Sequence, residues 1–334
     1  MFVAETNYFF RLSAYQERIE EWLASGRVCI RPEKRRVEIL RFVRSGLQDI
    51  SISRLASRSG GWGVPVPDDD LQVVYVWIDA LVNYLAGLGY GSGDQWREWW
   101  NPETRKIHVI GKNVWKFHAI YWPALLLSAG LPLPDELVIH GFLTANGRKI
   151  GKSAGNAVVP EGFIRKYGTD AVRYFLLRAE PPFDDADFSE ARSASVYEAD
   201  LANGLGNLVS RLLTLAARSG LSELGQEEAK VTDAALSRFA SERHHDEALA
   251  SIWQRIDALN RDLELAKPWD VLKSGGAEVV RPQVANWLRS VVGIALCLES
   301  FLPETSVRIL NHVRERPLKS CLPLFPRSPV LLRP

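Results

Sequence analysis

The sequence predicts an α/β protein in which a parallel sheet is followed by an all-α domain. In the first half, short apolar runs rich in β-branched residues alternate with helical patterns, which is typical of βαβ units. In the second half the strand-like runs stop, and three long helical patterns cover 189–217, 232–266 and 281–301. Five prolines after position 316 prevent a further helix there. We therefore expect a sheet domain over 1–185, a helical domain over 186–313 and an irregular tail over 314–334.

The elements of the first half follow in order. Apolar residues at three-to-four spacing predict an amphipathic helix over 7–25, with Gly26 as its C-cap. A second helix is expected to begin near Pro32 and to end before Gly46. Three apolar runs then predict strands, at 73–77, 106–111 and 137–144. The first two runs lead directly into helical patterns.

Composition limits the classes of protein that the chain can belong to. Hydrophobic residues make up 46% of the 334 residues and charged residues 24%, which is typical of a globular protein with a sizeable core. The net charge of +1 excludes a generally basic protein that coats nucleic acid, but it allows a local basic groove. The three isolated cysteines indicate neither a disulfide framework nor a zinc knuckle, so we expect a cytoplasmic protein. Charges throughout the first 22 residues argue against a signal peptide or a membrane span.

Two lysines stand out in a Gly/Ser-rich turn after the third apolar run. Lys149 and Lys152 lie in GRKIGKSAGN, beyond the carboxyl end of a predicted parallel strand, where α/β sheets bind ligands. In isolation, such a loop is more often a solvated surface turn. The functional interpretation is a flexible arm that closes over a triphosphate, with the ammonium groups neutralising charge on the departing pyrophosphate.

The surrounding sequence favours the functional interpretation. The string IHGFLTANGRKIGKSAGN resembles the signature-loop region of class I aminoacyl-tRNA synthetases, with the loop itself at 149–153. Three further segments, NYFFRLSAYQE, YVWIDALVNYL and HVIGKNVWKFHAIYWPALLLSAGLPLP, narrow the resemblance to methionyl-tRNA synthetase, from about residue 5 to about residue 313. The resemblance implies the second half of a Rossmann-like catalytic domain, followed by an anticodon-binding helical bundle. It also implies ATP-dependent activation of methionine and its transfer to tRNA.

The same resemblance implies which residues contact ATP. Lys149 and Lys152 would be the catalytic residues. The ATP-binding set comprises Gly111, Asn113, His140, Leu143, Lys149, Lys152 and Ser153. The family usually has aspartate at position 113, and the amide of Asn113 can bond a ribose hydroxyl but cannot act as a charged acceptor.

Two helix faces are candidates for the methionine pocket. Trp77, Ala80, Leu81 and Tyr84 recur at spacings of three and four, and so do Val114, His118 and Trp122, so each set can share a helix face. A thioether favours aromatic surroundings. By resemblance, these two faces line the methionine pocket and Asp79 lies beside it. Each aromatic residue alone would more often be ordinary core packing.

The helical half carries its own match. Asn203, Asn207 and Arg211 recur every four residues, and Trp269 follows a Lys-Pro pair. In the family these positions read the CAU anticodon, with polar groups on base edges and the indole stacked on a base. The alternative for the Asn/Arg stripe is an exposed polar helix face.

The sequence departs from the family in one large respect. It has neither the H-x-G-H element that helps to bind the ATP phosphates nor the connective insertion that often carries zinc, so we expect ATP and substrate-bound Mg²⁺ but no zinc site. The expected partners are methionine-specific tRNA, L-methionine and ATP, with no membrane, and a separate N-terminal synthetase half is a further candidate partner. Three interpretations stay open: part of a methionyl-tRNA synthetase, a paralogue that activates an amino acid in biosynthesis, and an inactive tRNA-binding remnant. We predict little or no adenylate formation by the chain alone.

Overall fold

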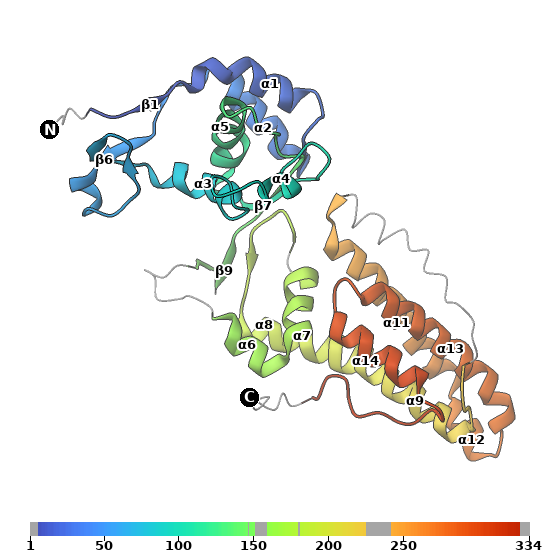
Figure 1. The fold of residues 1–334 in the computed structure, drawn as a ribbon. Coiled ribbons are helices and arrows are strands. Elements are labelled where there is room, and N and C mark those ends of the chain that lie inside the picture. The colour runs from blue at the N-terminus through green and yellow to red at the C-terminus, as the bar shows by residue number, and fades with distance from the viewer. Residues whose placement is uncertain (1–5, 146, 151–158, 180, 225–241, 328–334) are drawn as a thin grey trace. The chain divides into compact units, whose positions relative to one another are not determined.

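A computed structural model describes residues 6–145, 147–150, 159–179, 181–224 and 242–327. The chain forms two compact units, Met1–Gly141 and Phe142–Pro334, and each is described by itself. In Figure 1 the colour changes from blue at the N-terminus to red at the C-terminus, and the bar gives the residue numbers by which each unit can be found.

The first unit contains the parallel sheet that the sequence predicts. Strand β8 (Glu136–His140) lies in the middle, between β2 (Cys29–Arg31) and β7 (Ile107–Gly111), and both pairs are parallel. Helices α1 (Gln16–Ala24), α2 (Glu33–Arg44) and α5 (Trp122–Ser128) contribute apolar residues to one core cluster with these strands. The α/β prediction and the second predicted helix are therefore confirmed, whereas β2 is a strand that the sequence reasoning missed.

Two predicted elements of the first half were wrong in detail. The stretch 7–25 is not one helix: Phe9–Phe10 form β1, which pairs with β3 (Ile50–Ser51), and the 3₁₀ helix η1 (Leu12–Tyr15) precedes α1. The run 73–77 divides between β6 (Asp69–Val74) and α3 (Val76–Ala86). Strand β6 pairs in an antiparallel manner with β4 (Ser53–Leu55) and β5 (Pro65–Val66), outside the parallel sheet. Short apolar runs carry propensity but do not identify the pairing partner, which explains these errors.

The remaining helical elements of the first unit are short. They are η2 (Ala56–Ser59), α4 (Trp96–Trp99) and the π-helical turn η3 (Phe117–Tyr121). The sequence spacing had predicted a regular helix over the third of these, and the structure replaces its first part with a π turn. Such turns recur at functional sites.

The second unit begins with a small three-stranded sheet. Its central strand is β9 (Leu143–Ala145), paired antiparallel with β10 (Arg148–Lys149) and parallel with β11 (Ala186–Asp187). The predicted run 137–144 is therefore two strands, β8 and β9, because the chain leaves β8 after His140.

Helices make up most of the remaining described residues of the second unit, as predicted. They are α6 (Pro160–Tyr167), α7 (Thr169–Tyr174), η5 (Phe175–Ala179), α8 (Glu190–Val196), η6 (Tyr197–Gly206), α9 (Asn207–Ser219), α11 (His245–Ala266), α12 (Pro268–Lys273), α13 (Ala277–Leu298) and α14 (Pro303–Arg314). One large apolar cluster joins them. Residues 315–327, which follow α14, are irregular, yet Leu318, Leu324 and Phe325 are buried in this cluster. Within the described residues, no helix is both long and apolar enough to cross a membrane.

Candidate functional site

The centre of the candidate amino-acid site is a hydrogen bond between Tyr84 of α3 and His118 of η3. Nδ1 of His118 lies 3.0 Å from the carbonyl oxygen of Val114, and Nε2 lies 2.8 Å from the Tyr84 hydroxyl. A carbonyl can only accept, so Nδ1 carries the proton. Burial lowers the pKa of His118, which leaves Nε2 unprotonated near pH 7. The Tyr84 hydroxyl therefore donates to Nε2 and keeps its own oxygen as an acceptor.

A second aromatic pair lies on the same two helical elements. The ring of Trp77 stacks on Phe117 with centroids 3.9 Å apart and an interplanar angle of 13°. Sequence reasoning missed Phe117 because regular helix spacing places it off the stripe formed by Val114, His118 and Trp122. The π turn is the local feature that the spacing could not reveal.

The other predicted methionine-binding residues differ in exposure. Leu81 and Trp122 are each 1% exposed and lie in an apolar cluster with Leu85, Trp96, Trp100 and Leu126. The Trp122 ring is 5.9 Å from that of Tyr84. Asp79 and Ala80 are exposed on α3, and Val114 is half-buried.

Three predicted ATP-binding residues meet where β7 and β8 end. A Cβ added at Gly111 would lie 3.0 Å from Oδ1 of Asn113 and 3.7 Å from the His140 ring, so glycine permits this close approach. The amide of Lys112 donates to the carbonyl of His140 at 3.0 Å and ties the two strand ends together. Gly111, exposed Asn113 and exposed His140 thus share the carboxyl edge of the parallel sheet, where α/β domains bind ligands.

The remaining predicted ATP-binding residues belong to the second unit. Leu143 opens β9 and is exposed, and the backbone of Lys149 pairs with Thr144. Lys152 and Ser153 lie outside the described residues.

An aspartate that the sequence reasoning missed supports the start of the signature loop. Oδ1 of Asp187 accepts hydrogen bonds from the Gly147 amide at 2.6 Å and from the Thr144 hydroxyl at 2.7 Å. These two bonds, the first above all, lower the pKa of Asp187. Its signal in the sequence is the acidic string DDAD at 184–187, which by itself does not identify a role for Asp187.

The candidate anticodon residues come from three helical elements. Asn203 is exposed in η6, Asn207 begins α9 as a half-buried residue, and Arg211 lies one turn further along. The Arg211 guanidinium lies 4.8 Å from the centroid of the Trp269 ring, and its Nη2 is 2.7 Å from Oε1 of Glu264.

Local backbone geometry places Trp269 beside Arg211. Lys267 ends α11 in a left-handed conformation with φ 44°, and Pro268 opens α12. The structure therefore brings Arg211 and Trp269 together, although 58 positions separate them in the sequence.

No group of three or more His, Cys, Asp or Glu side chains that could hold a metal occurs within the part of the chain that the structure describes.

A parallel α/β domain with candidate ligand residues at its strand ends has the architecture of nucleotide-binding enzymes. Residues 1–213 match the family model described as tRNA synthetases class I (M), and the chain belongs to this family.

Two curated relatives are methionine–tRNA ligases. The protein of Thermotoga maritima is 38% identical over 96% of this chain and 52% of its own length, and that of a Nostoc species is 39% identical over 92% and 61%. The chain thus spans about half to three fifths of their length. A solved structure of Mycobacterium tuberculosis methionyl-tRNA synthetase bound by methionyl-adenylate matches with a TM-score of 0.82 at 33% identity, over 96% of this chain and 69% of that one.

Proposed function

We propose that the chain binds methionine and takes part in the methionine–tRNA ligase reaction, in which ATP activates methionine to methionyl-adenylate and the methionyl group passes to tRNA. The observation that carries this proposal is the aromatic site of the first unit, where Tyr84 and His118 are hydrogen-bonded and Trp77 stacks on Phe117. Such a site suits a thioether side chain, since sulfur contacts aromatic rings favourably. Trp77, Asp79, Ala80, Leu81, Tyr84, Val114, His118 and Trp122 are the proposed methionine-binding residues.

We assign ATP binding to the strand-end residues and to the signature loop. Gly111, Asn113, His140 and Leu143 would contact the nucleoside, and Lys149, Lys152 and Ser153 the phosphates of ATP with its Mg²⁺. The clustering of Gly111, Asn113 and His140 at one strand edge supports the first part. The lysine charges would stabilise the transition state for departure of pyrophosphate, as preorganised cations do in phosphoryl transfer.

We propose that Asn203, Asn207, Arg211 and Trp269 bind the CAU anticodon of methionine-specific tRNA in the cytoplasm. The support is the contact between Arg211 and Trp269, which combines a hydrogen-bond donor with a stacking surface. The proposed domains are the catalytic half over 1–185, the anticodon-binding bundle over 186–313 and the tail over 314–334.

Catalysis needs a further polypeptide segment, because the chain has no H-x-G-H element. Loss of a preorganised phosphate-binding group costs on the order of 10²–10³ in rate. We therefore expect methionine-dependent ATP–pyrophosphate exchange to be nearly absent with the chain alone and to appear when the N-terminal half of a related enzyme is added. Strong exchange by the chain alone would contradict this expectation.

The inactive alternative has its own outcome. Silence after addition, with association of the two halves verified, would favour the tRNA-binding remnant or the biosynthetic paralogue. Filter binding with methionine-specific tRNA and an anticodon-altered control then separates those two. The remnant should prefer the CAU anticodon, and the paralogue should not.

A further inference from the structure

The aromatic site contains a buried histidine that lies outside the proposed methionine-binding set. His108 is the second residue of β7, where side chains alternate between the two faces of the sheet. Its neighbours Ile107 and Val109 are 41% and 68% exposed, whereas His108 is only 7% exposed. The strand therefore turns a polar side chain inward and apolar side chains outward, the reverse of the usual arrangement.

His108 contacts both members of the central hydrogen bond. Its ring centroid is 4.6 Å from that of Tyr84, at an interplanar angle of 74°, and 5.7 Å from that of His118. The edge-to-face geometry with Tyr84 is a favourable arrangement for two rings. The His108 ring on β7 thus packs against the Tyr84 ring on α3.

The imidazole of His108 is neutral and incompletely hydrogen-bonded. Burial, assisted by the charge that His118 would carry, lowers the pKa of His108 to about 4. Its Nε2 is buried without a hydrogen-bond partner among the described residues. An unpartnered polar atom reduces stability, so packing alone would favour an apolar side chain at this position.

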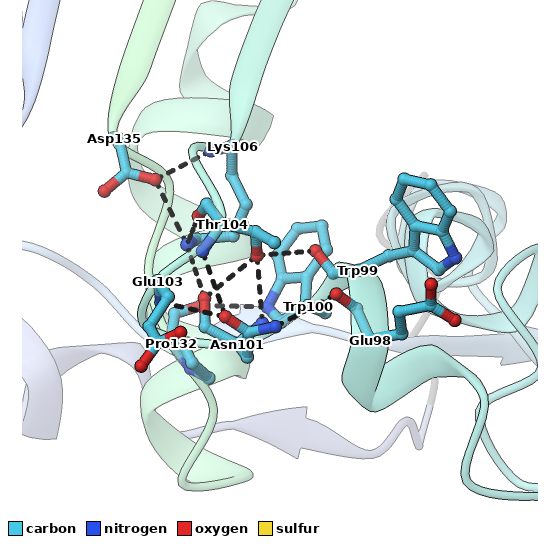
Figure 2. A network of polar contacts seen from close by, with 9 residues as sticks. All are labelled: Glu98, Trp99, Trp100, Asn101, Glu103, Thr104, Lys106, Pro132 and Asp135. Atoms are coloured by element: carbon cyan, nitrogen blue, oxygen red, sulfur yellow. Dashed lines mark hydrogen bonds and ion pairs between the residues drawn. The ribbon is translucent and has the colours of Figure 1, made fainter.

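A polar network holds Trp100, whose ring lies next to that of His108. Figure 2 shows Trp100 next to the loop that Asn101, Thr104 and Lys106 hold together. The indole Nε1 of Trp100 donates to the carbonyl of Pro132 at 3.0 Å. The centroid of the Trp100 ring lies 6.2 Å from that of His108 and 5.8 Å from that of Trp122. Contacts therefore run from this network through Trp100 and His108 to Tyr84.

We propose that His108 is a positioning residue for Tyr84: its ring, supported by Trp100, holds the tyrosine where the hydroxyl donates to Nε2 of His118. The proposal rests on the proposed function, since it assigns to His108 the support of the methionine pocket. It goes further by naming a residue on the strand that acts through Tyr84 without contacting the substrate.

The test uses the full chain and three variants. His108→Val removes the ring and suits a strand, His108→Phe retains a ring edge, and Ile110→Ala shortens a buried neighbour on the same face of β7. Long-range ¹H–¹⁵N spectra report whether the unprotonated Nε2 of His118 accepts a hydrogen bond, and Tyr84→Phe supplies the signal for complete loss. Calorimetric titration with L-methionine provides the second measurement.

His108→Val should move the Nε2 signal of His118 toward the Tyr84→Phe value and weaken methionine binding about three- to tenfold. His108→Phe should restore both, and Ile110→Ala should change neither even though it lowers stability. If His108→Val leaves both measurements as they are in Ile110→Ala, the positioning role is wrong. The spectrum requires no ligand, so failure of the unmodified chain to bind methionine would count against the proposed function and leave this test intact.

Discussion

At the scale of single residues, hydrogen-bond geometry determines what the candidate pocket offers to a ligand. Nε2 of His118 accepts from the Tyr84 hydroxyl because the proton of the imidazole is on Nδ1, which donates to the Val114 carbonyl. Spacing placed Tyr84 and His118 each on a helical stripe, and only the family resemblance implied that the two stripes line one pocket. They could not predict the tautomer, or the contact with His108, because these depend on where a strand packs against two helices.

Tyr84→Phe should weaken methionine binding more than it lowers stability. The substitution removes the hydroxyl that fixes His118 but leaves the ring contacts to His108 and Trp122. A neutral hydrogen bond contributes about 1 kcal/mol, so we expect roughly fivefold weaker binding in a titration. Equal affinity for methionine in the variant and the parent would contradict the proposed role of the hydroxyl.

The stability of the folded chain should decrease as the pH is lowered, because His108 has a depressed pKa in the folded chain. Its pKa of about 4 in the folded chain lies below the ordinary 6.5, so the unfolded chain binds the proton first as pH falls. The stabilising difference is complete above pH 6.5 and is lost as pH falls toward 4, by about 3 kcal/mol. Urea unfolding of the chain at pH 7 and pH 4.5 measures this loss, which His108→Phe should reduce. An identical pH dependence in parent and variant would show that other groups are responsible.

At the scale of elements, helices were easier to predict than strands. The spacing of apolar residues predicted α2 and α13 within a few residues, because each buries a stripe against a core. The predicted helix over 189–217 ends within two residues of the end of α9, but the structure divides it into α8, η6 and α9. Strands β2 and β11 were missed because they have only three and two residues, too few for a pattern. Such short strands form only because a partner strand supplies the hydrogen bonds.

Strand β11 matters for the signature loop, and Asp187→Ala should show this. The variant loses the acceptor for Thr144 and Gly147, which hold β9 and β10 at the start of that loop. We expect faster hydrogen exchange of the Gly147 amide and, in the complemented enzyme, a raised KM for ATP with little change in the KM for methionine. Thr144→Val removes only one of the two bonds and should give a smaller effect. A rise in both KM values would point instead to general loss of structure.

At the scale of the whole molecule, the parallel sheet ends in an exposed strand. Parallel sheets normally have both faces covered. In this sheet β7 lies at the edge of the described strands, and on one face its Ile107 and Val109 side chains are exposed. The sequence resembles only the second half of the family's catalytic domain, and an exposed edge of the sheet is consistent with that resemblance. The sequence alone could not show which strand would carry it.

We propose that the exposed face of β7 contacts the complementing half. Val109→Lys should leave the unfolding temperature of the isolated chain nearly unchanged, because the side chain is already 68% exposed. It should weaken association with the added half at least about tenfold, because a charge would be buried at the contact. Analytical ultracentrifugation measures the association of the added half with the parent chain and with the variant. A substitution at exposed Leu265 is the control. Unchanged association would place the contact elsewhere.

The loop in Figure 2 has a consequence for the chemistry of its lysine. The Lys106 ammonium donates to the carbonyls of Asn101 and Thr104 and pairs with Asp135, so each of its three protons has an acceptor. Its side chain is 6% exposed. An amine-selective acylating reagent needs a free lone pair and an open approach, and Lys106 offers neither. In the folded chain this lysine should remain unlabelled while surface lysines react, and its labelling would report the moment at which the loop opens.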